Sequence, residues 1–250
     1  DGRYKYSPTH VDVAECCAPQ ATRVYPFYVS NMWARTDKGF AALMLGPSQI
    51  NTEINGMKVR ITETTDFPFD NIVSFMIEPE SEADFEIRIR IPGWSNGKSI
   101  ESEGAMIRDE NAFAVVSKKW KKGDKITLTL NPEIAVLKAN NGESYLQRGP
   151  LVYALEIPSV DKKVKTWPVA GFYDQHFVAK KGFDFNLSFD GSAGAAFGFT
   201  SATNKAGSNL WVNSPLSLKG KMINSKSQRV DVTLVPVGST ILRKITFKVK

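Results

Sequence analysis

The alternation of apolar and polar residues dominates the chain from residue 34 onward. Residues 85–91 show it most cleanly, because Phe-Glu-Ile-Arg-Ile-Arg-Ile places apolar side chains on one face and charges on the other. Residues 58–64 alternate in the same way, and further strand-like runs occupy residues 39–45, 49–54, 72–77, 113–117 and 125–130. Asn55-Gly56 between two of these runs predicts a type I′ hairpin. Short strands separated by turns are typical of an antiparallel β-sandwich. We therefore predict one sandwich over residues 34–138.

A second series of strand patterns follows the turn sequence Asn140-Asn141-Gly142. It comprises residues 151–157, 183–189, 197–201, 216–219, 229–237 and 241–249. Residues 162–167 are predicted as a loop, and the small residues of 191–198 predict a loop or bulge. We predict a second sandwich over residues 139–250. The predicted fold class is therefore mainly β, with two antiparallel, jelly-roll-like sandwich modules.

One segment before the strands has helical periodicity. Apolar residues recur there at spacings of three and four, namely Ala21, Val24, Tyr25, Tyr28, Val29 and Met32. We predict a helix near residues 18–33, bent at Pro26. Apolar residues surround this helix almost completely, as in helices that pack among other helices, and no second helical pattern is present. Either the helix packs on the first sandwich or its partners lie outside this chain, and we favour the second interpretation.

Composition and charge narrow the function classes. The chain has 250 residues, of which 42% are apolar and 23% charged, as in ordinary globular proteins. No run of 18 apolar residues is present, so we predict no membrane partner. The net charge of +6 is scattered along the sequence. The densest basic run, residues 118–122, is interpreted as a polar turn before a strand, so no nucleic-acid partner is predicted.

The candidate chemistry lies at the start of the predicted helix. Cys16 and Cys17 are the two cysteines of the chain, and neighbouring cysteines rarely form a disulfide with each other. A helix N-terminus lowers a thiol pKa. The pair is therefore either two small buried apolar residues or joint ligands of a soft metal, and two thiols do not complete a tetrahedral zinc site. His10 and His176 are interpreted as ordinary surface or core histidines.

Six segments, in order along the chain, resemble glycoside hydrolase family 127, the β-L-arabinofuranosidases. The first, Glu-Cys-Cys-Ala-Pro-Gln-Ala-Thr-Arg at residues 15–23, is similar to the family's Cys-Cys-Pro-Pro-Asn-x-x-Arg signature. The others are Thr-Asp-Phe-Pro-Phe-Asp (65–70), Arg-Ile-Arg-Ile-Pro-Gly-Trp (88–94), Trp-x-x-Gly-Asp (120–124), Arg-Gly-Pro-Leu-Val-Tyr (148–153) and Leu-Val-Pro-x-Gly-x-Thr-x-Leu-Arg (234–243).

The resemblance implies a fold and a set of site residues. Such enzymes have an (α/α)₆ barrel followed by two β-sandwiches, so residues 1–33 would be a remnant of the catalytic barrel with its last helix. Their zinc is held by a glutamate and three cysteines, which makes Cys16 and Cys17 metal ligands by resemblance. Cys16 would also be the nucleophile, forming a thioglycosyl intermediate with retention. Ala18 and Gln20 depart from the signature, and Glu15 does not align with the family's glutamate ligand.

The resemblance thus implies the C-terminal accessory region of a zinc-dependent retaining glycoside hydrolase acting on arabinofuranosides. We expect the chain to be inactive alone, with zinc absent or partly ligated. The implied partners are a carbohydrate substrate and the N-terminal barrel, and polysaccharide degradation favours a secreted or periplasmic location over a cytoplasmic one. The alternative is a non-catalytic carbohydrate-binding or structural module. In it, the tryptophans would either stack on sugars or fill cores, and they include Trp94, Trp120, Trp167 and Trp211.

Overall fold

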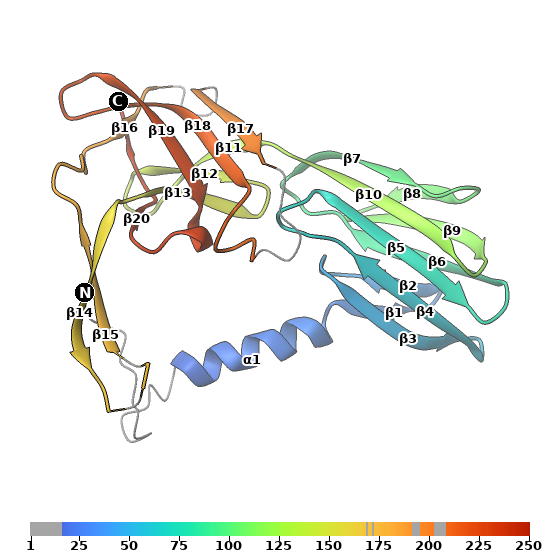
Figure 1. Cartoon of the computed structure of the whole chain (residues 1–250). Coiled ribbons are helices and arrows are strands. Elements are labelled where there is room, and N and C mark those ends of the chain that lie inside the picture. The colour runs from blue at the N-terminus through green and yellow to red at the C-terminus, as the bar shows by residue number, and fades with distance from the viewer. Residues whose placement is uncertain (1–16, 169, 172, 192–195, 203–208) are drawn as a thin grey trace. The chain divides into compact units, whose positions relative to one another are not determined.

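The computed structural model describes residues 17–168, 170–171, 173–191, 196–202 and 209–250 (Figure 1). Most of these residues form strands, which confirms the predicted mainly β class. One α-helix, α1 (Cys17–Ser30), occurs among the described residues, contains Pro26 and ends three residues before the predicted boundary. The described residues divide into two compact units, the first Val24–Glu133 and the second residues 17–23 together with Ile134–Lys250.

Two five-stranded sheets form the first unit. One sheet has the strand order β1 (Trp33–Thr36), β2 (Gly39–Ala42), β6 (Ala83–Arg90), β9 (Phe113–Trp120), β8 (Met106–Glu110). The other has the order β3 (Ser48–Ile54), β4 (Met57–Thr64), β5 (Ile72–Pro79), β10 (Asp124–Pro132), β7 (Ser95–Glu101). The alternating apolar side chains of both sheets share one core, in which Ile61, Phe75, Ile87, Ile89, Ile126 and Leu128 are fully buried. The predicted β-sandwich is therefore confirmed for this part of the chain.

In the first unit, one predicted turn is confirmed and one predicted strand direction is wrong. Asn55 and Gly56 have φ values of 51° and 76° between the paired residues Ile54 and Met57, as a type I′ hairpin requires. The pair β2–β6 is parallel, although we predicted antiparallel pairing throughout. Alternation within a strand does not encode the direction of its neighbour, so the sequence pattern could not reveal this pair.

A single branched sheet forms most of the second unit. Its path runs β11 (Ile134–Lys138), β12 (Ser144–Arg148), β13 (Leu151–Glu156), β19 (Arg229–Pro236), β18 (Leu216–Ile223), β16 (Ser188–Phe189), β21 (Lys248–Val249). Two further strands join it, β17 (Phe197–Ser201) on β18 and β20 (Arg243–Lys244) on β13. A bridge between Ser144 and Phe247 brings the end of this path back to β12. The sheet therefore folds over a core that includes Tyr153, Phe189 and Phe247.

Several predicted elements of the second unit were wrong. Residues 162–167 are not a loop, because β14 (Ser159–Thr166) pairs with β15 (Tyr173–Ala179). Both faces of this ribbon are largely exposed, so no apolar alternation marked it. Residues 241–249 are two short strands rather than one, since β20 pairs with β13 and β21 with β16. In the 191–198 segment, residues 192–195 lie outside the described residues.

Candidate functional site

The predicted cysteine site lies at the edge of the described structure. Helix α1 begins at Cys17, at the predicted helix start. Cys16 lies outside the described residues, as does His10, and the side chain of Cys17 is not described either. Among the residues described from 17 onward, no three His, Cys, Asp or Glu side chains gather as a metal site. The nucleophile and the zinc ligands therefore stay predictions.

Much of the exposed surface of helix α1 is apolar. Val24, Tyr25 and Phe27 are 65%, 74% and 69% exposed. Helix α1 and the segment after it join the first unit through the Tyr28 hydroxyl, which donates to the Leu45 carbonyl at 3.2 Å, and through the buried Met32. Contiguous apolar surface of this kind marks an interaction face more often than a solvated one. We therefore interpret the outward side of α1 as a face that another structural element covers.

A buried carboxyl group lies just inside the first unit, where the strands meet the segment after α1. Glu63 is 2% exposed, because it follows Val59 and Ile61 on the core-facing side of β4. Its Oε1 accepts the Gly46 N–H at 3.0 Å, and its Oε2 accepts the Ser48 hydroxyl at 2.9 Å. No sequence motif marks this residue as functional, although its position in the strand alternation places it facing inward.

Burial determines the electrostatics of this carboxyl group. Removal from water raises the pKa of Glu63 to about 7, although the hydrogen bonds from Gly46 and Ser48 act in the opposite direction. Burial, with a smaller contribution from Glu63, also raises the pKa of the Tyr28 hydroxyl. Trp33 donates its indole N–H to Ser48 at 2.9 Å, so the carboxyl group stands at the end of a short hydrogen-bonded chain. Glu63 thus changes charge near neutral pH.

Two of the family-like motifs meet in space. Residues 65–70 form a turn that bonds to itself, with the Phe67 N–H donating to Thr65 Oγ1 at 3.0 Å and the Thr65 hydroxyl donating to the Ile72 carbonyl at 2.7 Å. This turn presents Phe67 to Trp94, the last residue of the 88–94 motif. Their rings are nearly parallel, with centroids 6.3 Å apart and an interplanar angle of 12°. The motifs therefore build one local structure.

The tryptophans that we considered as sugar platforms lie in different environments. Trp120 is fully buried and donates to the Phe85 carbonyl at 2.9 Å, so it has no exposed face for a sugar or a base. Trp94 is partly buried against Phe67. Trp167 donates to Asp174, and Trp211, which is 44% exposed, lies against Gly238. The stacking interpretation is wrong for Trp120.

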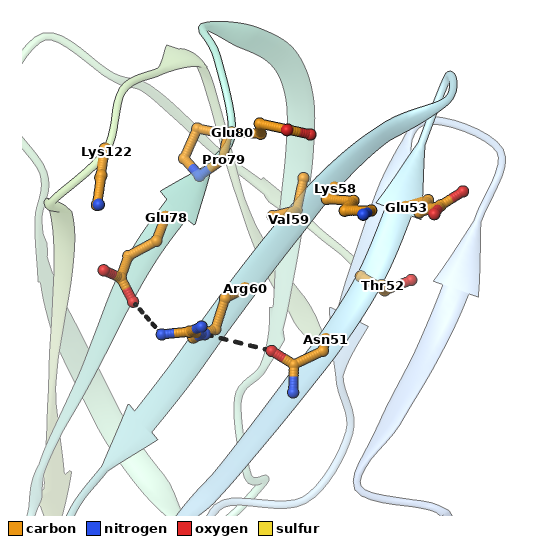
Figure 2. A pocket seen from close by; sticks show the side chains of 10 residues that line it. All are labelled: Asn51, Thr52, Glu53, Lys58, Val59, Arg60, Glu78, Pro79, Glu80 and Lys122. Carbon is orange, nitrogen blue, oxygen red and sulfur yellow. Dashed lines mark hydrogen bonds and ion pairs between the residues drawn. The ribbon is translucent and has the colours of Figure 1, made fainter.

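One concavity of the first unit lies on the outer side of strands β3, β4 and β5. Figure 2 shows Arg60 between Glu78 and Asn51, at 3.7 Å from the Glu78 carboxylate and 3.3 Å from the Asn51 side-chain oxygen. The groove measures about 590 Å³ and has no aromatic residue in its lining. Its central cation, Arg60, is already paired with Glu78, and its remaining charged residues are exposed. We interpret it as a solvated sheet face and assign no ligand to it.

Comparison with known proteins gives the class of the fold. Three similar solved structures are a GH127 β-L-arabinofuranosidase from Geobacillus stearothermophilus T6, a glycoside hydrolase and a GH127 β-arabinofuranosidase. Their TM-scores are 0.68, 0.70 and 0.66, at 21%, 20% and 16% sequence identity. The matches cover 95%, 99% and 95% of this chain but 38%, 42% and 39% of those chains. The chain therefore has the fold of a β-rich part of larger glycoside hydrolases and spans less than half of their length.

A comparison with models of protein families gives a family for part of the chain. Residues 41–132 match the family described as β-L-arabinofuranosidase, GH127 middle domain. This match confirms the resemblance to family 127 that the motifs predict. No curated protein sequence matches the chain. Within the residues that the structure describes, no helix is long and apolar enough to cross a membrane.

Proposed function

We propose that this chain is the C-terminal accessory region of a zinc-dependent, retaining glycoside hydrolase that acts on β-L-arabinofuranosides or related sugars. The GH127 match over residues 41–132 carries the proposal. The order of the motifs and the extent of the structural likeness, which reaches nearly the whole chain but less than half of the similar enzymes, support it. The remaining part of the enzyme would be the (α/α)₆ barrel, and its helices would cover the exposed side of α1.

Two adjacent thiol groups are what this chain itself would contribute to a metal site. Adjacent thiolates are donors that zinc prefers, and Cys16 and Cys17 would be two of the four ligands. The remaining ligands are proposed to come from the barrel, since the described residues supply no cluster that completes the site. Bound zinc would keep the thiols deprotonated. Cys16 would then attack the anomeric carbon while the bond from that carbon to the leaving alcohol's oxygen breaks, and an acid of the barrel would protonate that oxygen. A carboxylate has the role of Cys16 in most retaining glycosidases.

The two sandwiches are proposed to be structural rather than catalytic. Trp120 and the apolar residues around it fill a core, as expected of a module that supports another domain. Polysaccharide degradation is the proposed role of the whole enzyme, with a secreted or periplasmic location.

Zinc binding tests the ligand assignment. We expect this chain to bind zinc more weakly than a complete four-ligand site. We expect Cys16→Ser to weaken the remaining affinity by about tenfold or more, because replacing even a residue that only orients a metal ligand costs about that much. Calorimetric titration of the chain, the Cys16→Ser variant and a Ser30→Ala control measures this difference. Tight, stoichiometric zinc in Cys16→Ser would remove Cys16 from the site.

Hydrolysis tests the assignment to an accessory region. We expect no turnover of an aryl β-L-arabinofuranoside by this chain alone, whereas the product of the complete gene should show zinc-dependent turnover that Cys16→Ser abolishes. The release of the aryl group is followed by absorbance. Turnover by the chain alone would overturn the accessory assignment, and an active Cys16→Ser variant of the complete product would overturn the nucleophile.

A further inference from the structure

A second, smaller pocket lies in the first unit beside the segment that follows α1. It has a volume of about 320 Å³, at the lower end of the range for small-molecule sites. Its lining includes Tyr28, Leu45, Phe67, Arg90 and Trp94. These residues come from the helix, the segment before β3, the turn after β4 and the end of β6 with the residues that follow it. The pocket is thus where the two family-like motifs meet the helix.

The free polar side-chain groups of this pocket are hydrogen-bond donors. Among the described residues, the Arg90 guanidinium makes no hydrogen bond or ion pair, and the Trp94 indole N–H has no hydrogen-bond acceptor. The neighbouring Arg88 is different, because it pairs with Glu110 at 2.8 Å. The Tyr28 hydroxyl already donates to Leu45. A pocket whose free groups are a cation and an N–H donor favours a ligand with a negatively charged acceptor.

The walls of the pocket indicate which class of ligand carries the negatively charged group. Phe67 and Trp94 form a parallel aromatic pair on one side, and Leu45 lies on another. Aromatic faces of this kind attract the weakly positive C–H groups of a sugar ring. A guanidinium, which is planar, binds a carboxylate through two parallel hydrogen bonds. We propose that this pocket binds a sugar that carries a carboxylate group, a uronate, with Arg90 holding the carboxylate.

The choice of a sugar rests on the proposed function, while the choice of a carboxylate rests on the donors of the pocket. The site would hold an acidic unit of a polysaccharide. Because binding requires neither zinc nor turnover, it can be measured on this chain. If the chain does not bind a uronate, the proposed glycoside hydrolase function still stands. If the complete gene product does not hydrolyse the arabinofuranoside, uronate binding by this pocket can still be measured.

Binding of sugars to the chain tests the proposal. We expect D-galacturonate to bind saturably, and D-galactose and acetate to bind about tenfold more weakly, since each lacks one half of the recognised chemistry. Arg90→Gln should weaken galacturonate binding by about tenfold or more, the range for a charge-assisted hydrogen-bonded pair. Arg60→Gln, in the solvated groove, is the matched control and should bind as the wild type does. Calorimetry at low ionic strength and ligand-detected NMR measure these affinities.

Three results would overturn the proposal. They are equal affinity for galacturonate and galactose, unchanged galacturonate affinity in Arg90→Gln, and preference for a glutamate-containing peptide over galacturonate, which would assign the pocket to a protein partner. Arg90 is exposed, so its replacement should leave the urea midpoint of the chain unchanged. Trp94→Leu provides a second variant, because it removes the aromatic wall while Arg90 is kept.

Discussion

Replacing Gly39 by alanine is expected to destabilise the first unit by about 4 kcal/mol or more, a loss that single substitutions rarely reach. A Cβ at this position would lie 2.0 Å from the carbonyl oxygen of Glu86, which is backbone and cannot rotate away. Gly39 has a φ of 154° and pairs with Glu86 in the parallel contact between β2 and β6. Separating these strands would break the sheet where its chain direction changes.

A matched glycine distinguishes the clash from backbone strain. Gly104 has a φ of 65°, but a Cβ there would meet nothing within 4 Å. We expect Gly104→Ala to cost about 1–2 kcal/mol, the cost of a left-handed conformation alone. Urea unfolding, followed by hydrogen exchange of the amides of β6 and β9, compares the two variants with the wild type. Equal losses in both variants would show that the close approach of Gly39 to Glu86 does not limit stability.

The sandwich was predictable where one face of each strand is buried. Strands β4, β5, β6 and β10 alternate because a shared core selects every second residue, and the pattern shows which face is inside. The same argument fails for β7 and β8, whose residues are mostly exposed or half-buried, and for the ribbon of β14 and β15. These strands are held by backbone hydrogen bonds to neighbouring strands, and such pairing imposes little pattern on their side chains.

The candidate site was predictable only in part. The motifs at 65–70 and 88–94 were identified as family-like, but neither shows that Phe67 and Trp94 stack, because that contact depends on how the two sheets pack. The free Arg90 is equally invisible in the sequence, where it alternates with Ile89 and Ile91 like any outward-facing charge. What distinguishes it from Arg88 is the absence of a partner among the described residues, and partners are a property of the fold.

Glu63 is the clearest case of a site residue whose position follows from the strand alternation. The two-residue repeat of a strand places Glu63 with Val59 and Ile61 on the inner face of β4, although burying a carboxylate at such a position costs free energy. The structure keeps it there with two hydrogen bonds and at a pKa of about 7. The segment around Gly46 is thereby tied to β4, and Tyr28 binds the same segment. We therefore expect the protonation of Glu63 to affect the segment to which the Tyr28 hydroxyl donates.

Stability of the first unit is expected to fall as the pH rises from about 4.5 to above 7. The pKa of Glu63 is about 7 in the folded chain, against an ordinary value of 4.5, so the folded state holds a proton that the unfolded state releases. The contribution is fully present below pH 4.5 and is lost as the pH rises through 7. At 1.36 kcal/mol for each pKa unit, the loss amounts to about 3 kcal/mol.

Glu63→Gln should remove this dependence, because the amide keeps an acceptor for the Gly46 N–H and cannot ionise. At pH 8 we expect the variant to be more stable than the wild type by up to about 3 kcal/mol, and at pH 4.5 the two should be nearly equal. Glu78→Gln, on the solvent side of β5, is the control and should keep the wild-type slope. Urea unfolding at pH values from 4.5 to 8, monitored by hydrogen exchange of β4 amides, measures the slope in this unit. A wild type and a Glu63→Gln variant with the same pH slope would show that the carboxyl group ionises at its ordinary pH and is not held protonated by burial.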